Sequence, residues 1–406
     1  MKIVIASSGQ PSTNPRMVRE ADALANSGHD VLVIYAHWSS WASPFDQQML
    51  KAKKWKAIVA GGSPSHSPVK YFLSRICHKL NSFLARNLSM KYFSKLAISR
   101  SSTSLIRKVK QQKADLYIAH NLGALPAIVI AAKYHHKPCG FDAEDLHRYE
   151  VSNDNREYDV QLKTYIEQKY IPQLKYMTTS SPQINAMYKL LFPDSSPVCL
   201  LNVTDKQQQT SIMSIHPGDP IRLFWCSQTI GLKRGIEDVI GALRLISTYK
   251  FELHLMGSQQ HGETRTYFTS LMNAAHPIFF HGPVAPEHLV VHAAQFDIGL
   301  ALEPGFSINN DLALSNKVFT YIQAGLAVIA SNTTAQQSFM ASNPEIGHCY
   351  EIGVISNLSA ILCSYAENRT LLDKARKASF NLGQHSLNWE EEKLKFLKII
   401  HTLPCP

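Results

Sequence analysis

Residues Ala313–Asn332 read ALSNKVFTYIQAGLAVIASN. Ser315 is a residue type that caps helix N-termini, and Gly325 suits the left-handed conformation that often ends a helix. The apolar run 327–330 follows directly and predicts a short buried strand. A helix that passes straight into such a strand is typical of α/β folds built on parallel sheets.

Strand and helix patterns alternate along the rest of the chain. Apolar runs predict strands at 2–6, 31–36, 57–60, 115–119, 139–142, 176–179 and 198–201. Further strands are predicted at 221–226, 252–256, 278–280, 297–302 and 327–330. Helical patterns separate most of these runs, and this alternation predicts parallel strands in doubly wound, Rossmann-like α/β sheets.

Length and one polar segment divide the chain. A chain of 406 residues exceeds what one hydrophobic core usually supports. The polar segment Thr204–Pro220 predicts a linker. We therefore expect Rossmann-like domains at 1–203 and 221–388, a linker at 204–220, and a helix at 389–406 that packs back on the N-terminal domain. Two such domains would face each other across a cleft that the carboxyl ends of their strands line.

Cysteine spacing and hydropathy indicate the compartment. The seven cysteines form no Cys-x-x-Cys or Cys/His metal spacing, which predicts no metal site and favours a reducing environment. The apolar run in MKIVIASSGQ is too short for a signal peptide, and no run reaches the roughly 18 apolar residues of a membrane span. These patterns predict a cytoplasmic protein.

Positive charge is concentrated in one segment. Residues 51–113 contain fifteen Lys and Arg and no acid, whereas the whole chain has 41 Lys and Arg against 31 Asp and Glu. Within this segment, apolar residues 69–88 recur at helical spacing between basic residues. A basic amphipathic helix of this kind binds anionic membrane surfaces, so we expect residues 51–113 to hold the protein on the inner face of the membrane. The alternative is that the apolar stripe packs on its own domain. No motif for nucleic-acid recognition accompanies the segment.

A glycine-rich basic loop begins the C-terminal domain. The segment 224–240 reads FWCSQTIGLKRGIEDVI and places Gly231, Lys233, Arg234 and Gly235 between a predicted strand and a predicted helix. Glycines permit close backbone approach, a helix N-terminus offers free N–H groups, and the two cations add charge, which together favour a diphosphate site. An ordinary surface turn is the alternative.

Lys317, in the helix predicted between Ser315 and Gly325, is a second candidate for binding a phosphate. Asn316 and Lys317 stand in the first turn of that helix, where a cation opposes the helix macrodipole by a few tenths of a kcal/mol. Such a placement requires a nearby anion, and a bound phosphate would supply it. The alternative is that Lys317 reaches a carbonyl group or water.

Polar clusters also follow predicted strands of the N-terminal domain. They are Gly9, Asn14 and Arg16; His120 and Asn121; and Asp142, Glu144, Asp145 and His147. A carboxylate in these loops could act as a general base toward a substrate hydroxyl, and acids that converge raise one another's pKa. Two other interpretations stay open, namely that residues 142–145 cap the following helix and that His120 is a buried histidine with satisfied nitrogens.

These segments resemble the large "group 1" family of bacterial glycosyltransferases with the GT-B fold. The resemblance rests on SQTIGLKRGIEDVI and EPGFSINNDLALSNKVFTYIQAGLAVIAS, which are similar to the family's donor-binding half, and on NPRMVREADALANSGHDVLVIYA, which is similar to its first helix and second strand. It extends from Met1 to about Ser331, although the basic segment has no detailed counterpart.

The resemblance implies roles for individual residues. Arg234 matches the second member of the family's diphosphate-binding basic pair, and the first falls near Gln228 or is supplied by Lys233. Glu303 matches an acid that approaches the donor sugar. Thr320 stands where the family generally has a ribose-binding acid, so ribose binding would be weaker or would fall to Asn316.

The activity implied is that of a glycosyltransferase of the hexosyltransferase type. It would move a sugar from a nucleotide-sugar donor to a hydroxyl of a glycan or lipid-linked acceptor in cell-surface polysaccharide synthesis. Cations would bind the diphosphate, so no cofactor and no metal are expected. The donor would contact Gly231, Lys233, Arg234, Gly235, Ser315, Asn316, Lys317 and Thr320. The acceptor would contact the loop with Gly9, Asn14 and Arg16, and the catalytic candidates are His120, Asp142, Glu144 and Glu303.

Two other functions share the architecture. A sugar-nucleotide epimerase would bind the same donor without an acceptor, and the basic segment argues against it. A non-catalytic partner subunit of another transferase would keep the fold without activity, and the missing acid at Thr320 is its best support.

Overall fold

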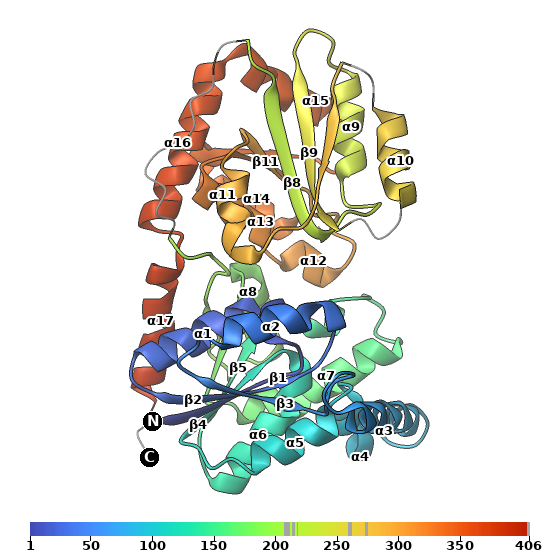
Figure 1. Cartoon of the computed structure of the whole chain (residues 1–406), viewed down its shortest axis with the longest axis vertical. Helices are drawn as coiled ribbons and strands as arrows, with labels where there is room; N and C mark the ends of the chain where they lie inside the picture. Colours follow the sequence, from blue (N-terminus) through green and yellow to red (C-terminus); the bar gives the residue numbers. More distant parts are fainter. Residues whose placement is uncertain (207–211, 213–215, 217, 259–261, 273–274, 404–406) are drawn as a thin grey trace. The chain divides into compact units, whose positions relative to one another are not determined.

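The computed structural model describes residues 1–206, 212, 216, 218–258, 262–272 and 275–403 (Figure 1). Its contacts group the chain into two compact units. The first unit comprises Met1–Leu201, Ser307–Asn309 and Lys393–Pro406, and the second comprises Asn202–Phe306 and Asn310–Glu392. Much of the predicted linker at 204–220 lies outside the described residues.

The first unit contains a parallel sheet of seven strands. The strands are β1 (Lys2–Ser7), β2 (Asp30–Ala36), β3 (Lys56–Ala60), β4 (Leu116–His120), β5 (Cys139–Ala143), β6 (Tyr176–Thr179) and β7 (Val198–Cys199). They are ordered β3-β2-β1-β4-β5-β6-β7. The chain adds strands in one direction from β1 and then returns to add β4 on the other side, so a topological switch point lies between β1 and β4.

Helices pack on both faces of the first sheet (Figure 1). They are α1 (Pro15–Asn26), α2 (Ser43–Leu50), α3 (Pro68–Asn87), α4 (Met90–Ala97), α5 (Ser102–Lys110), α6 (Leu125–His135), α7 (Tyr158–Tyr170) and α8 (Pro182–Leu191). Asn14 caps α1 by accepting a hydrogen bond from the backbone N–H of Met17 at 3.0 Å. The cap positions α1, which carries charged side chains into the core of this unit.

The second unit repeats the plan with a parallel sheet of six strands. They are β8 (Ile221–Thr229), β9 (Phe251–Ser258), β10 (Ile278–His281), β11 (Ile298–Ala301), β12 (Ala327–Ser331) and β13 (Gly347–Tyr350). Their order, β10-β9-β8-β11-β12-β13, puts the switch point between β8 and β11.

Two hydrophobic cores fill the two faces of the second sheet. The remaining helices of the chain are α9 (Ile236–Arg244), α10 (Gly262–Leu271), α11 (Leu289–Ala293), α12 (Ile308–Leu312), α13 (Asn316–Ala324), α14 (Thr334–Ser342), α15 (Ile355–Glu367), α16 (Arg369–His385) and α17 (Trp389–Thr402), and most of α17 belongs to the first unit. Along β8, Leu223 and Trp225 join the core beneath α9 and α15, whereas Phe224 and Cys226 join the core beneath α11 and α13. This alternation is what a strand covered on both faces requires.

The predicted fold class is confirmed, with two doubly wound parallel sheets whose strands begin and end within a few residues of the predicted bounds. The helix predicted from Ser315 to Gly325 is also present. Gly325 ends it with a φ of 71°, the left-handed conformation expected of a C-terminal glycine. The short strand β13 was missed because Gly347–Tyr350 contains no apolar run.

We expect Gly299→Ala to destabilise the second unit. Gly299 lies in β11, and a Cβ atom there would come within 2.2 Å of the Tyr321 ring, which is buried between α13 and the sheet. Overpacking of this kind costs about 1–3 kcal/mol, so urea unfolding should begin at a lower urea concentration. Gly282→Ala is the matched control, because Gly282 is exposed and an added Cβ meets no atom within 4 Å. Equal unfolding midpoints for the two variants would contradict the packing described.

Candidate functional site

The predicted site residues gather at the carboxyl ends of strands that border the two switch points and of the neighbouring strand β5. In the first unit, Arg16 follows β1 by way of the loop 8–14, His120 ends β4 and Asp142 lies in β5. In the second unit, the loop 230–235 follows β8, and Glu303 follows β11. Open α/β sheets bind their ligands at such places. We describe the two sheet edges separately.

Arg16 and Asp142 form the centre of the first cluster. The guanidinium donates from Nε to Asp142 Oδ2 at 2.6 Å and from Nη2 to Oδ1 at 2.8 Å, which is a bidentate pair. Thr178 of β6 donates its hydroxyl to Oδ1 at 2.6 Å, and Arg16 Nη1 donates to the carbonyl oxygen of Leu200 at 2.6 Å. Both charged side chains are at most 2% exposed. The pair thus joins α1 to the centre of the sheet.

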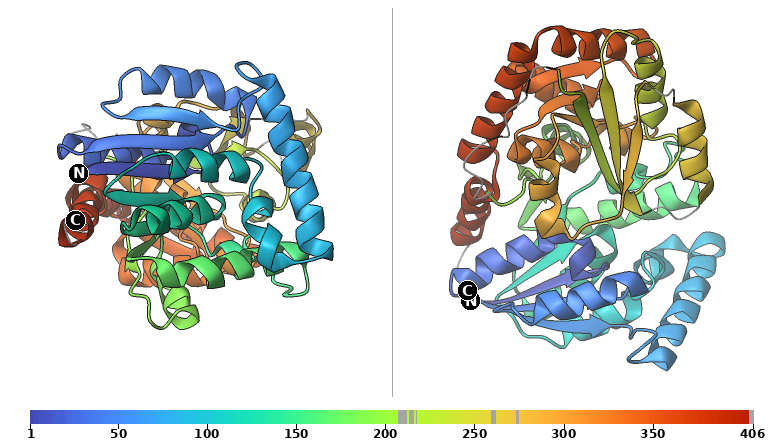
Figure 2. Two further views of the ribbon diagram at one scale, coloured as in Figure 1. Left: turned by 90° about the horizontal axis from the view of Figure 1, so that it is seen from below. Right: turned by 45° about the horizontal axis from the view of Figure 1, so that its top comes forward.

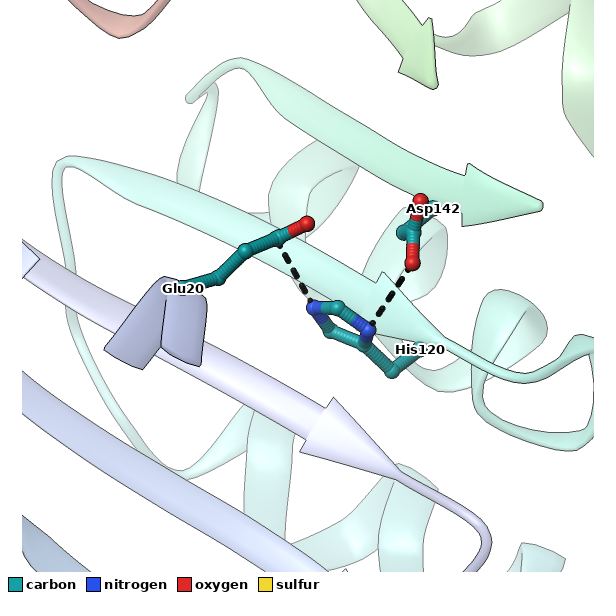
Figure 3. A group of neighbouring side chains, drawn as sticks. All are labelled: Glu20, His120 and Asp142. Atoms are coloured by element: carbon teal, nitrogen blue, oxygen red, sulfur yellow. Dashed lines mark hydrogen bonds and ion pairs between the residues drawn. The ribbon is translucent and has the colours of Figure 1, made fainter. Parts of the chain in front are cut away.

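His120 extends this pair to a second carboxylate (Figure 3). Its Nε2 lies 3.0 Å from Glu20 Oε2, and its Nδ1 lies 3.3 Å from Asp142 Oδ2. Both ring nitrogens therefore face carboxylate oxygens, which favours the doubly protonated imidazolium. Arg16, Glu20, His120 and Asp142, which we call the buried quartet, then carry two positive and two negative charges.

The pKa values follow from this arrangement. Burial disfavours the charged form of His120, but the charge of Glu20 and the hydrogen bonds that the ring donates to both carboxylates outweigh it and raise the pKa to about 10. Burial also opposes the charged form of Asp142, yet the charge of Arg16 and the bond to His120 hold its pKa well below the ordinary value. Burial raises the pKa of Glu20, although the charge of His120 lowers it in part. Of the two carboxylates, Asp142 thus stays ionised to lower pH, and Glu20 is the one that protonates first as pH falls.

This geometry decides between the interpretations of the N-terminal loops. His120 is 1% exposed and both nitrogens have partners, so the structure supports the buried, satisfied histidine. Asp142 caps no helix, and its carboxylate is enclosed by the quartet and Thr178. In this conformation neither side chain is open to a substrate. Both are suited to positioning the end of β4 and the loop after β5.

Glu20 was not among the predicted site residues. It lies one helical turn after Arg16 on α1, and both side chains are buried together with Met17, Ala21 and Leu24. The sequence does contain a signal for Glu20, namely two charged residues at i and i+4 on the apolar face of a helix. Because buried charges need partners, this pattern indicates a buried ion pair or cluster.

Glu20, His120 and Asp142 could be considered as metal ligands, because one atom from each lies within 4.8 Å of the others. The two nitrogens of His120, however, point to different carboxylates, so only one of them could bind an ion (Figure 3). Arg16 already supplies the positive charge beside Asp142. The chemistry of this set therefore fits an ion cluster better than a metal centre.

Other predicted site residues of the first sheet edge are less deeply buried than the quartet. Asn121, with a φ of 65°, accepts hydrogen bonds on Oδ1 from Ser7 Oγ at 3.0 Å and from Asn14 Nδ2 at 3.3 Å. Gly9 donates its backbone N–H to Ser7 Oγ at 3.1 Å. Glu144 follows β5 and is half-buried, and burial together with the charge of Asp145 raises its pKa to about 7.

The basic loop of the second unit lies between β8 and α9, as predicted. Lys233 and Gly235 adopt left-handed φ values of 58° and 78°, and Lys233 and Arg234 are exposed. Arg234 Nη1 donates to Ser227 Oγ at 3.0 Å. The backbone N–H of Lys233 already donates to Glu237 Oε1 at 2.9 Å, so that amide is occupied in this conformation. The exposed guanidinium and ammonium groups are the parts of this loop most open to an anion.

Lys317 pairs with Glu303 in the same unit. Its Nζ lies 2.6 Å from Glu303 Oε1, and Ser315 Oγ donates to the same oxygen at 2.7 Å. Burial opposes ionisation of Glu303, but the charge of Lys317 and these hydrogen bonds lower its pKa. The anion expected near Lys317 is therefore present within the chain. Ser315 is the N-cap residue of α13, but its side chain does not cap the helix, because its hydroxyl donates a hydrogen bond to Glu303 instead.

The basic loop and this ion pair lie at one edge of one sheet. A Cβ atom on Gly235 would meet the Cβ of Leu302, the residue before Glu303, at 2.7 Å. Lys317 Nζ lies 5.9 Å from the ring centroid of Trp225, two residues before Ser227, to which Arg234 bonds. Arg234 and Lys317 therefore occur at neighbouring strand ends, as a shared ligand would require.

Thr320 and Asn316 differ in accessibility. Thr320 is 5% exposed, and its hydroxyl donates to the carbonyl oxygen of Asn316 within α13 at 3.3 Å. The Asn316 side chain is exposed at the start of the helix. Of the two positions considered for ribose binding, Asn316 is the one open to a ligand.

Solved structures resemble this chain over its whole length. A sucrose-phosphate synthase from Thermosynechococcus elongatus is 14% identical, with a TM-score of 0.70 and 99% coverage of both chains. A glycosyltransferase from Rickettsia africae is 13% identical, with a TM-score of 0.67 and 99% coverage of both chains. The Anabaena protein HepE, solved in complex with UDP and glucose, is 13% identical, with a TM-score of 0.69 and coverage of 99% of this chain and 100% of HepE.

These solved proteins are GT-B glycosyltransferases, and this chain has their fold. No protein-family model matches the sequence, and no curated protein matches it. At such low sequence identity the likeness concerns the fold.

We predict that Glu20→Gln lowers the pKa of His120. The amide has nearly the shape of the carboxylate but lacks the charge that favours the imidazolium, so the pKa should fall by about one to three pH units. Histidine-selective ¹⁵N NMR would follow the titration, with His120→Gln to assign the resonance. Glu287→Gln, at an exposed position, is the control and should leave the resonance unchanged.

The same cluster predicts a pH window for stability. Because the pKa of His120 is raised, its contribution to the free energy of unfolding is fully present below about pH 6.5, the unfolded value, and is lost as pH rises through about 10. Urea unfolding between pH 7 and pH 10.5 should therefore show a steeper loss of stability for the wild type than for Glu20→Gln. Parallel losses would show that the imidazolium is not held by Glu20.

Proposed function

We propose that this protein is a glycosyltransferase. It transfers a hexose from a nucleotide-sugar donor to a hydroxyl of a glycan or lipid-linked acceptor, in the synthesis of cell-surface polysaccharide. The observation that carries the proposal is the second sheet edge, where Lys233 and Arg234 of the loop after β8 and Lys317 of α13 occur at neighbouring strand ends.

The likeness to HepE supports the class of donor. HepE was solved with UDP-glucose and with UDP and glucose, and its fold is that of this chain. A nucleoside diphosphate carries the negative charge that the exposed cations of the basic loop would bind. The first turn of α13 has no side-chain cap, so the backbone N–H groups of Asn316 and Lys317 offer further donors to a phosphate, whereas that of Val318 already donates to the carbonyl oxygen of Ser315.

The same groups can stabilise the leaving nucleotide. Negative charge grows on the diphosphate as the glycosidic bond breaks, and fixed cations beside it lower the energy of the transition state. Glu303 remains ionised because Lys317 and Ser315 hold it, so it can accept hydrogen bonds from hydroxyls of the donor sugar. We assign sugar orientation to Glu303 and diphosphate binding to Lys233, Arg234 and Lys317.

Glu144 is the best candidate for the catalytic base. It follows β5 of the first sheet, is half-buried, and has a pKa raised to about 7 by burial and by the charge of Asp145. A carboxylate with a pKa near the working pH is an efficient proton acceptor. Asp142 and His120 are enclosed in the quartet, so we assign them the positioning of the loop that carries Glu144.

We expect Arg234→Ala and Lys317→Ala each to weaken nucleoside diphosphate binding by about 1.5–3 kcal/mol, the range for hydrogen bonds to charged groups. Calorimetric titration with UDP, and with GDP and ADP in parallel, would measure the loss. Arg244→Ala is the control, because Arg244 is an exposed arginine at the other end of α9. Unchanged affinity in both variants would remove the donor site. Binding of none of these nucleotides by the wild type would favour the non-catalytic subunit.

Glu144→Gln should reduce turnover at least tenfold with little change in nucleotide affinity, because a base acts mainly in the transition state. Wild-type turnover should rise as pH passes through about 7, since the base works only when deprotonated. Release of nucleotide from donor and acceptor measures turnover, and Glu157→Gln, at an exposed acid, is the control. An epimer formed from the nucleotide-sugar without acceptor would identify an epimerase instead.

A further inference from the structure

Helix α3 exposes an apolar stripe to solvent. Its residues recur at helical spacing along one face, and their exposed fractions run from 46% to 70%; they are Val69, Phe72, Leu73, Ile76, Leu80 and Phe83. Leu88, directly after the helix, is 71% exposed. The stripe extends along a helix of 20 residues, or about 30 Å. Monomeric soluble proteins rarely leave a contiguous apolar surface of this kind without a partner.

The opposite face of α3 packs against the rest of the first unit. Tyr71 contacts the ring of His37 at 5.4 Å, and the carbonyl oxygen of Ser82 accepts a hydrogen bond from Tyr158 at 3.1 Å. Ala85 is buried, and Ser74 and His78 are half-buried. The helix therefore turns a mainly small and polar face inward and its apolar face outward. The alternative that the stripe packs on its own domain is wrong.

The position of α3 leaves the stripe accessible along its length. In Figures 1 and 2 the helix lies at the edge of the first unit, outside the sheet. Its most extensive helix contacts are with α4 and α5. Among the described residues, no helix is long and apolar enough to cross a membrane.

The charge around the stripe is positive. Lys79 and Arg86 are exposed on one flank of the apolar face, and Lys70 is exposed on the other. They belong to the segment 51–113, which holds fifteen Lys and Arg and no acid. Long basic side chains beside an apolar face can reach lipid headgroups while the face enters the acyl region. Aliphatic side chains such as Leu73 and Leu80 offer nothing to a nucleic-acid backbone.

We propose that α3 binds an anionic lipid surface, with its apolar stripe in the interfacial region of the bilayer and its flanking cations on the headgroups. This inference goes beyond the proposed glycosyl transfer and does not depend on it, because vesicle binding needs neither nucleotide nor acceptor. A protein held at the membrane in this way would meet an acceptor that carries a lipid anchor.

Flotation of the full-length protein with vesicles tests the proposal. We expect binding to vesicles of phosphatidylcholine with about 30% phosphatidylglycerol, and much weaker binding to phosphatidylcholine alone. Leu73→Ser with Leu80→Ser should reduce binding at least tenfold. Leu190→Ser with Leu245→Ser is the matched control, because these leucines, in α8 and directly after α9, are 73% and 57% exposed. All four positions are exposed, so thermal unfolding should be unchanged.

A second pair of variants tests the contribution of the basic side chains to vesicle binding. Lys70→Glu with Lys79→Glu should weaken binding to the anionic vesicles, and the wild-type affinity should fall as salt rises. Lys250→Glu with Lys374→Glu changes the net charge equally at exposed positions of the second unit and should have little effect. This comparison separates a local docking surface from a general effect of net charge.

Several outcomes would overturn the proposal. They are absence of wild-type binding to the anionic vesicles, equal losses in the stripe variants and their controls, and insensitivity of binding to both salt and the lysine substitutions. Retention on DNA without vesicle binding would assign the surface to nucleic acid. Concentration-dependent dimerisation that Leu73→Ser with Leu80→Ser abolishes, again without vesicle binding, would assign it to a second copy of the chain.

Discussion

A shielded carboxylate paired with a cation in the first turn of a helix organises the carboxyl edge of each sheet. In the first unit the pair is Asp142 with Arg16, and in the second it is Glu303 with Lys317. Removing charges from water is costly unless they are paired at short range, so each pair constrains the helix that supplies its cation. The loops near the switch points are thereby anchored to the sheets. In the first unit the pair is almost fully buried, whereas Lys317 and Glu303 keep part of their side chains exposed.

At the first sheet edge the positive and negative side chains of the buried quartet balance, whereas the second edge keeps an excess of positive charge. The two edges therefore suit different roles. The quartet of Arg16, Glu20, His120 and Asp142 is internally neutral and almost fully buried. The second edge compensates Lys317 with Glu303, but Lys233 and Arg234 remain exposed. A neutral, enclosed cluster supports structure, whereas uncompensated cations on a glycine-rich loop attract anions. We therefore assign anion binding to the second edge, although both edges have the same topology.

Local patterns predicted the architecture well, because strands covered on both faces read as continuous apolar runs and a C-terminal glycine shows where α13 ends. The ion pairs were harder to predict, because their members are far apart in the chain. Lys317 was expected to need an anion, yet that anion is Glu303, fourteen residues earlier, brought close by the loop after β11. Glu20 escaped notice for the same reason, since its partner His120 is separated from it by a hundred residues.

Helix α3 shows a further limit of reasoning from periodicity. The spacing of Phe72, Ile76 and Phe83 defines an apolar face equally well whether that face points toward the protein or away from it. Only tertiary contacts settle the direction, and here Tyr71, Ser82 and their neighbours face inward. A helix that turns its apolar face outward leaves that face in water until a partner covers it. The free energy gained by burying the apolar side chains then contributes to binding instead of folding. The same hydrophobic effect that closes the cores of both sheets is thus available, at this helix, to attach the protein to a surface.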